Sequence, residues 1–110
     1  MAEITIEEFT TGFIKSVGEN SGLDAIIKFA FDDGGFIWID GKNVPNSVTN
    51  EDKPADVTLK MSLETLNKLH RKELNGMMGV MSGKIKIEGN MMAAMKCNLL
   101  ISYSARRAIS

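Results

Sequence analysis

Hydrophobic and polar residues alternate along four stretches of the chain, which is the pattern of β-strands with one buried and one solvated face. These stretches are residues 23–32, 36–40, 57–61 and 84–88. The apolar face of the first carries Ala25, Ile27, Phe29 and Phe31. The second is apolar on both sides, so its pattern leaves open which side is buried. The polar stretch 44–51 contains a proline and is at best an edge strand or a loop.

The first two of these strands are separated by a sequence typical of a tight turn. Asp33-Gly34-Gly35 lies between them, and glycine readily adopts the positive φ angles that a hairpin turn requires. We therefore expect strands 23–32, 36–40 and 57–61 to be antiparallel neighbours, followed by strand 84–88.

A capping box predicts a helix near the N-terminus. Thr5 and Glu8 have the spacing at which each side chain accepts a hydrogen bond from the main chain of the other. We expect this helix to run from about residue 6 to residue 20. Its apolar side carries residues at four-residue spacing, namely Phe9, Phe13 and Val17.

Two shorter helices are predicted between the third and fourth strands. Ser62 is a plausible N-cap for a helix with Leu63, Leu66 and Leu69 or His70 on one side. Asn75 is a plausible N-cap for a second helix over residues 76–82. Two glycines weaken this second helix, which makes it a candidate for a movable flap.

The terminal helix is expected to begin at Met91, after Asn90 as its N-cap, and to run toward Tyr103. Its inward positions are expected to be Met92, Met95 and Leu99, with Met91 beside them.

Six of the eight methionines fall just before or just after the strand at 84–88. They are Met77, Met78, Met81, Met91, Met92 and Met95. Because methionine is unbranched and polarizable, these residues either fill an irregular core or form a pliable wall around apolar ligands of varying shape. Composition alone favours the core.

Two segments of the chain resemble the sterol carrier protein 2 family. The run Gly83-Lys84-Ile85-Lys86-Ile87-Glu88-Gly89-Asn90-Met91, continuing through Ala94-Met95-Lys96, is similar to the C-terminal signature of that family. Lys53-Pro54-Ala55-Asp56-Val57-Thr58-Leu59-Lys60-Met61-Ser62 and the spacing from there to Gly83 also match it. The resemblance covers roughly residues 22–100 and rests on structural patterns, so it specifies the fold better than the ligand.

The resemblance implies an α+β fold, with an antiparallel-dominated sheet of about five strands and helices on one face. Between the sheet and the helices it implies a hydrophobic tunnel that holds a fatty acid, fatty acyl-CoA, phospholipid or sterol. It implies no cofactor and no catalytic residue, so the expected protein is a lipid carrier that makes transient contact with membranes. The expected wall comprises Met77, Met78, Met81, Met91, Met92, Met95, Leu99, Ile85, Ile87, Val57, Leu59, Ile27 and Phe29.

Composition further restricts the kind of protein that the chain can be. A chain of 110 residues with 44% hydrophobic residues can bury one core, so residues 1–110 are expected to form a single domain. Thirteen basic residues against fourteen acidic ones argue against a nucleic-acid-binding protein. The sequence shows no secretory signal, no membrane-spanning run and no Ser-Lys-Leu type of peroxisomal address. These features favour a cytoplasmic location.

Candidate catalytic groups are few. His70 is the one histidine, and its leucine-rich helix favours a surface or capping role. Cys97 is the one cysteine, and its position favours a small buried hydrophobe. One histidine and one cysteine cannot supply a structural zinc site. We therefore expect no intrinsic enzymatic activity.

The sequence leaves two alternatives to the function of a lipid carrier open. The domain could be an accessory subunit that presents an isoprenoid or acyl intermediate to a partner enzyme. Alternatively, its own methionines could fill the cavity and leave an interaction domain without a lipid. The first predicts a stable protein partner, and the second predicts no bound lipid.

Overall fold

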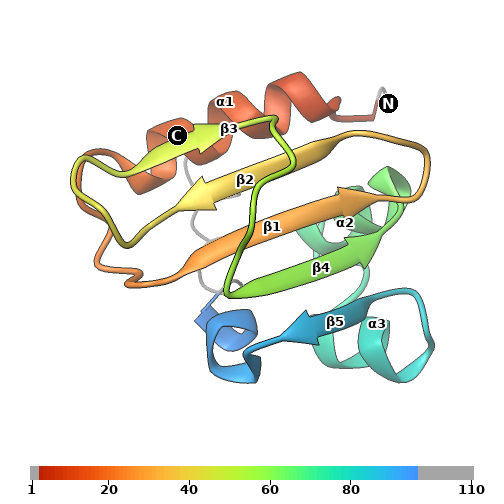
Figure 1. The fold of residues 1–110 in the computed structure, drawn as a ribbon. Coiled ribbons are helices and arrows are strands. Elements are labelled where there is room, and N and C mark those ends of the chain that lie inside the picture. The colour runs from red at the N-terminus through yellow and green to blue at the C-terminus, as the bar shows by residue number, and fades with distance from the viewer. Residues whose placement is uncertain (1–2, 97–110) are drawn as a thin grey trace.

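The computed structural model describes residues 3–96, and the sequence-based expectations for Cys97, Leu99 and Tyr103 lie outside this range. Its five strands form one mixed sheet in the order β3-β2-β1-β4-β5 (Figure 1). Their bounds are Ile26–Phe31 for β1, Phe36–Asp40 for β2, Ser47–Thr49 for β3, Val57–Met61 for β4 and Lys86–Gly89 for β5. The α+β class and the five strands are as predicted from the sequence.

The pairing of β1 with β4 differs from the prediction, because these two strands are parallel. The pairs β1–β2, β2–β3 and β4–β5 are antiparallel, and the predicted glycine turn connects β1 to β2. The β3–β4 connection, residues 50–56, runs across the sheet before β4 begins (Figure 1). This crossing returns the chain to the starting end of β1, so β4 runs in the same direction.

The crossing segment also explains why β2 is apolar on both sides. Ile37 and Ile39 are fully buried in the core on one face of the sheet. On the other face, the Trp38 indole N–H donates a 3.0 Å hydrogen bond to the Pro54 carbonyl. The Lys53 ammonium lies 4.7 Å from the centre of the same ring. Trp38 is therefore buried beneath residues of the crossing segment.

Two strands begin later in the chain than predicted. Asp24 has a φ of 51°, which a strand does not accommodate, and β1 starts two residues after it. The N–H groups of Lys84 and Ile85 both donate to the Gly79 carbonyl. These two residues thus close the C-terminal end of a helix, and β5 starts only at residue 86.

The predicted N-caps begin the helices α1 (Ile6–Val17), α2 (Leu63–His70) and α3 (Gly76–Met81). Residues 91–96 are also helical, and the Asn90 side chain accepts hydrogen bonds from the N–H groups of Met92 and Ala93. Helix α1 is three residues shorter than expected, because Gly18 with a φ of 55° ends it. No described helix is long and apolar enough to cross a bilayer.

Helices α1, α2 and α3 lie on the same side of the sheet (Figure 1). The core lies between them and the sheet, where Phe13 of α1 stacks on Phe29 of β1 at 5.5 Å between ring centres. The predicted stripe of α1, which also includes Phe9 and Val17, is buried there. Helix α1 therefore covers strands β1, β2 and β3. Strands β4 and β5 are covered by α2, α3 and residues 91–96.

Candidate functional site

A pocket of about 380 Å³ opens over the last two strands of the sheet. This volume lies near the lower end of the roughly 300 to 1,000 Å³ typical of small-molecule sites. Twelve residues line it, and none has a charged or hydroxyl-bearing side chain. They are Leu59, Met61, Leu69, Gly76, Met77, Val80, Met81, Ile85, Ile87, Met91, Ala94 and Met95.

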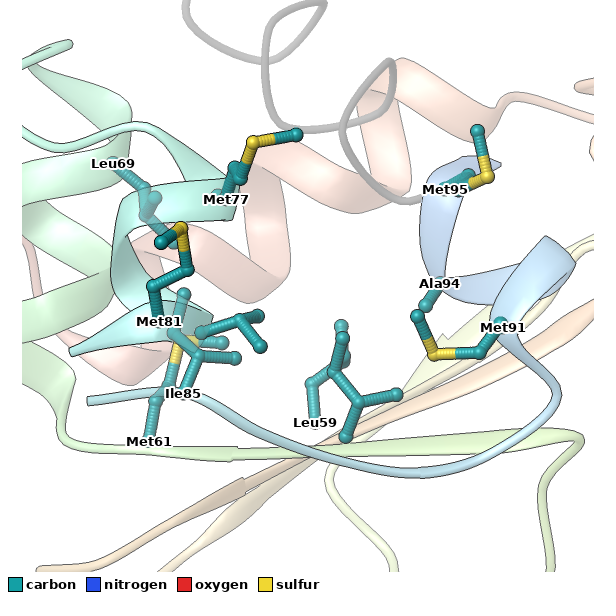
Figure 2. A pocket seen from close by; sticks show the side chains of 12 residues that line it. Leu59, Met61, Leu69, Met77, Met81, Ile85, Met91, Ala94 and Met95 are labelled. Carbon is teal, nitrogen blue, oxygen red and sulfur yellow. The ribbon is translucent and has the colours of Figure 1, made fainter. Parts of the chain in front are cut away.

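The walls of the pocket come from segments on both sides of strand β5. Figure 2 shows Met77 and Met81 of α3 on one side and Met91 and Met95 of the helical segment 91–96 on the other. Leu59 of β4 rises between them from the sheet (Figure 2). A chain-like apolar ligand placed in this space would touch helix on two sides and sheet on the third.

The floor of the pocket is buried and its rim is exposed. Leu59, Met61 and Ile85 are almost completely buried. In contrast, the four rim methionines shown in Figure 2 are more than half exposed. Large apolar side chains in such a cluster are unusual on the surface of a soluble protein and commonly mark a binding site.

Gly79 sets the position of the α3 wall. A β-carbon at this position would lie 2.9 Å from Cγ1 of Ile85 and closer still to its Cδ1. Only glycine allows α3 to approach Ile85 this closely without displacement of either. The sequence suggested that Gly79 merely weakens the helix, whereas the structure gives it a packing role at the edge of the pocket.

The spacing of residues along the helical segment 91–96 explains the wall opposite α3. Met91, Ala94 and Met95 are separated by three and four residues and share the helix face that lines the pocket. Met92 does not line the pocket, so its predicted inward position is wrong. Ala93, beside it, is buried against the core.

The pocket brings together seven residues of the wall expected from the sequence. These are Leu59, Met77, Met81, Ile85, Ile87, Met91 and Met95. Five others do not line it, namely Ile27, Phe29, Val57, Met78 and Met92. The remaining expected residue, Leu99, lies outside the described residues.

The five residues fall outside the pocket for two physical reasons. Ile27, Phe29 and Val57 have no exposed surface and pack in the core of the sheet, where the ring of Phe13 covers Phe29. Met78 on α3 and Met92 on the opposite helical segment point away from the pocket, and they are 53% and 70% exposed.

Five lining residues were not predicted, although the sequence contains a signal for most of them. Met61 shares a strand face with Leu59 by simple alternation, and Ala94 follows Met91 at helical spacing. Val80 shares a helix face with Met77 by the same argument. The other two are Leu69 and Gly76.

The one histidine of the chain, His70, directly follows the lining residue Leu69. Burial, and secondarily the charge of Arg71, lowers the pKa of its imidazole. Its Nδ1 atom is buried and has no hydrogen-bond partner among residues 3–96, and its ring lies edge-on to Phe9 at 5.7 Å. An imidazole ring packed edge-on against an aromatic side chain has the environment of a structural residue.

Metal chemistry finds no support in the described part of the chain. Residues 3–96 contain no group of three or more histidine, cysteine, aspartate or glutamate side chains that could hold a metal ion. The pocket itself offers apolar contacts and thioether sulfurs, which are weak hydrogen-bond acceptors. Its arrangement therefore suits non-covalent binding of an apolar group.

Comparison with known sequences identifies one matching family. The profile of the SCP-2 sterol transfer family matches residues 17–102, which include every residue that lines the pocket. No curated protein matches the chain in sequence.

Three solved structures share the fold over most of their own length. The sterol carrier protein domain 2 of Helicoverpa armigera is 27% identical with a TM-score of 0.72, over 96% of this chain and 91% of that chain. Sterol carrier protein 2 from Aedes aegypti in complex with the C16 fatty acid palmitate is 19% identical with a TM-score of 0.60, over 72% and 74%. The UbiJ-SCP2 ubiquinone synthesis protein is 15% identical with a TM-score of 0.56, over 92% and 79%.

Proposed function

Because the chain belongs to the SCP-2 sterol transfer family, we propose that it binds the acyl chain of a lipid in the pocket between α3, the sheet and residues 91–96, and exchanges it with membranes. The observation that carries this proposal is the lining of the pocket, whose twelve residues are all apolar. Such a surface recognises the bulk of a ligand and discriminates little between chains of similar thickness.

The proposed ligand is a fatty acid or a fatty acyl thioester, with its polar head outside the pocket. Burying a carboxylate among the lining residues would leave it without a hydrogen-bond partner, which is strongly unfavourable. The exposed rim formed by Met77, Met81, Met91 and Met95 is where the chain would enter. The relative from Aedes aegypti, whose structure contains palmitate, supports this class of ligand.

Energetics favour exchange over permanent retention. A chain of about sixteen carbons gains roughly 13 kcal/mol on leaving water, at about 0.8 kcal/mol per methylene. The same chain gains almost nothing on leaving a bilayer, because it was already surrounded by hydrocarbon. The pocket would thus equilibrate lipid with membranes during transient contact and would need no catalytic residue.

The test is titration of palmitate into the unmodified protein and into two variants of neighbouring residues. Met91→Gln places an amide in the pocket, whereas Met92→Gln places the same amide on the outer side of the same helix. We expect saturable binding by the unmodified protein, about tenfold weaker binding by Met91→Gln and unchanged binding by Met92→Gln. Absence of saturable binding by the unmodified protein would refute the proposal.

A second role, presentation of a lipid intermediate to an enzyme, is supported by the fold shared with the UbiJ-SCP2 ubiquinone synthesis protein. This role uses the same pocket but requires a stable protein partner. Native mass spectrometry of the protein at its natural expression level, with solvent extraction of bound lipid, separates the two roles. A stoichiometric complex with a second protein supports presentation, and a free chain with exchangeable lipid supports transfer.

A further inference from the structure

The methionines of this protein differ sharply in their access to solvent. The four that line the rim are highly exposed: Met77 by 74%, Met81 by 76%, Met91 by 58% and Met95 by 69%. Met61, which lines the floor of the same pocket, is only 1% exposed. The sulfur atoms of the rim are therefore open to small reagents in water, and that of the floor is shielded.

We propose that Met77, Met81, Met91 and Met95 form an oxidation site through which peroxide closes the pocket to lipid. The inference rests on the proposed lipid-binding function. In the reaction, a lone pair of the thioether sulfur attacks one oxygen of hydrogen peroxide and the O–O bond breaks. The sulfur is oxidised by two electrons to the sulfoxide, and the other oxygen leaves as water. Thioether and peroxide are the only reactants, so no cofactor is required.

The sulfoxide changes what the rim can bind. Its S=O group is strongly polar, whereas no lining side chain offers a hydrogen-bond donor to it. A lipid chain that covered this group would remove it from water without compensation. We therefore expect oxidation of the rim to weaken palmitate binding by about tenfold or more.

Lipid and peroxide compete for the same atoms. In Figure 2 the side chain of Met91 extends toward the space above Leu59, and Met81 lies on the opposite wall of that space. An acyl chain in that space covers both thioethers and slows their oxidation. The empty protein is thus the oxidisable form, and the loaded protein is protected. Because methionine sulfoxide reductases reverse the modification, the change is a reversible one.

The chain contains internal controls for this proposal. Met78 and Met92 are exposed by 53% and 70%, yet neither lines the pocket. They should react with peroxide at rates similar to the rim methionines, but bound lipid should not protect them. Each lies next in sequence to a rim methionine on the same helix, so differences in helix stability cannot explain a different response.

The experiment treats the protein with hydrogen peroxide, with and without palmitate, and measures each methionine by peptide mass spectrometry. A Cys97→Ala background removes the one thiol that peroxide also oxidises. We expect palmitate to slow sulfoxide formation at the four rim methionines by fivefold or more, and to leave Met78 and Met92 unchanged. Met61 should remain unoxidised in both conditions.

Palmitate binding is then measured before and after oxidation in two variants of that background. One carries leucine at positions 77, 81, 91 and 95, and the other carries leucine at positions 78 and 92. We expect peroxide to leave the affinity of the first variant at that variant's own untreated value, and to weaken binding by the second variant by about tenfold or more. Equal loss in both variants, or undiminished binding by the oxidised parent protein, would overturn the proposal. Failure of the untreated protein to bind palmitate would instead overturn the proposed function.

Discussion

Gly79 and Ile85 lie so close together that a β-carbon at position 79 would stand 2.9 Å from Cγ1 of Ile85. Replacement by alanine favours the helical conformation by about 1 kcal/mol, but it forces Ile85, which is nearly fully buried, to move. Such overpacking typically costs about 1 to 3 kcal/mol. We therefore predict that Gly79→Ala lowers the free energy of unfolding and weakens palmitate binding, measured by urea unfolding and titration.

A second substitution tests the cause of this effect. Ile85→Val deletes Cδ1, the atom that a β-carbon at position 79 would approach most closely. When Ile85→Val is already present, Gly79→Ala should therefore lower the free energy of unfolding by less than it does in the unmodified protein. The difference between the two losses, which is the coupling energy, should be about 0.5 kcal/mol or more. Additive effects of the two substitutions would show that the close approach does not position α3.

The side chain of Asn67 joins α2 to the segment that precedes α1. Its Oδ1 accepts a 2.8 Å hydrogen bond from the Ile4 N–H, and its Nδ2 donates to the carbonyls of Ile4 and Leu63. Asn67 is 1% exposed, and its loss would leave the partly buried main-chain groups of Ile4 without these partners. We predict that Asn67→Leu lowers the free energy of unfolding by about 1 to 3 kcal/mol. A change below about 0.5 kcal/mol in urea unfolding would contradict this role.

Stability should decrease as the pH falls below about 6.5, the ordinary pKa of histidine. Burial lowers the pKa of His70 in the folded protein, so the unfolded chain binds the proton first as the pH falls. Stability rises with pH wherever the unfolded state binds more protons, and this window lies between the lowered pKa and about 6.5. The measurement is urea unfolding at a series of pH values between about 7 and 5.

The variant His70→Gln provides the control, because glutamine does not titrate. We expect its unfolding free energy to vary less over this window than that of the unmodified protein. An identical pH dependence in both proteins would assign the effect to other groups. Nuclear magnetic resonance titration of the His70 ring gives the direction of its pKa shift independently.

Local patterns were sufficient to predict most elements of the fold. The capping residues Thr5, Ser62, Asn75 and Asn90 each begin a helix in the structure, because a cap acts within one turn of chain. The alternation in β1, β2 and β4 likewise depends on nearest neighbours alone. Residues 86–89 also form a strand, although it starts later than the pattern suggested.

The parallel pairing of β1 with β4 could not be predicted from these patterns. Alternation specifies which face of a strand is buried but not which strand lies beside it. The pairing depends on the path of residues 50–56, which the bond from Trp38 to the Pro54 carbonyl fixes through contacts between distant parts of the chain.

The lining residues could be predicted where they follow helical spacing or the alternation of a strand. Counting from Met91 rather than Met92 gives the observed face of the terminal helix, since Ala94 and Met95 follow at three and four residues. Ile27 and Phe29 were misassigned because a buried strand face looks the same whether a ligand or a phenylalanine of α1 covers it. Only the packing of Phe13 on Phe29 distinguishes these cases.

The most direct test locates bound palmitate with isotope-labelled methionine methyl groups. Nuclear Overhauser effects between these methyl groups and an unlabelled palmitate chain report which side chains touch the ligand. We predict such effects from Met77, Met81, Met91 and Met95, and none from Met78 or Met92, which lie outside the pocket. Palmitate that binds saturably but contacts Met78 and Met92, or none of the rim methionines, would contradict the assignment of this pocket as the lipid site.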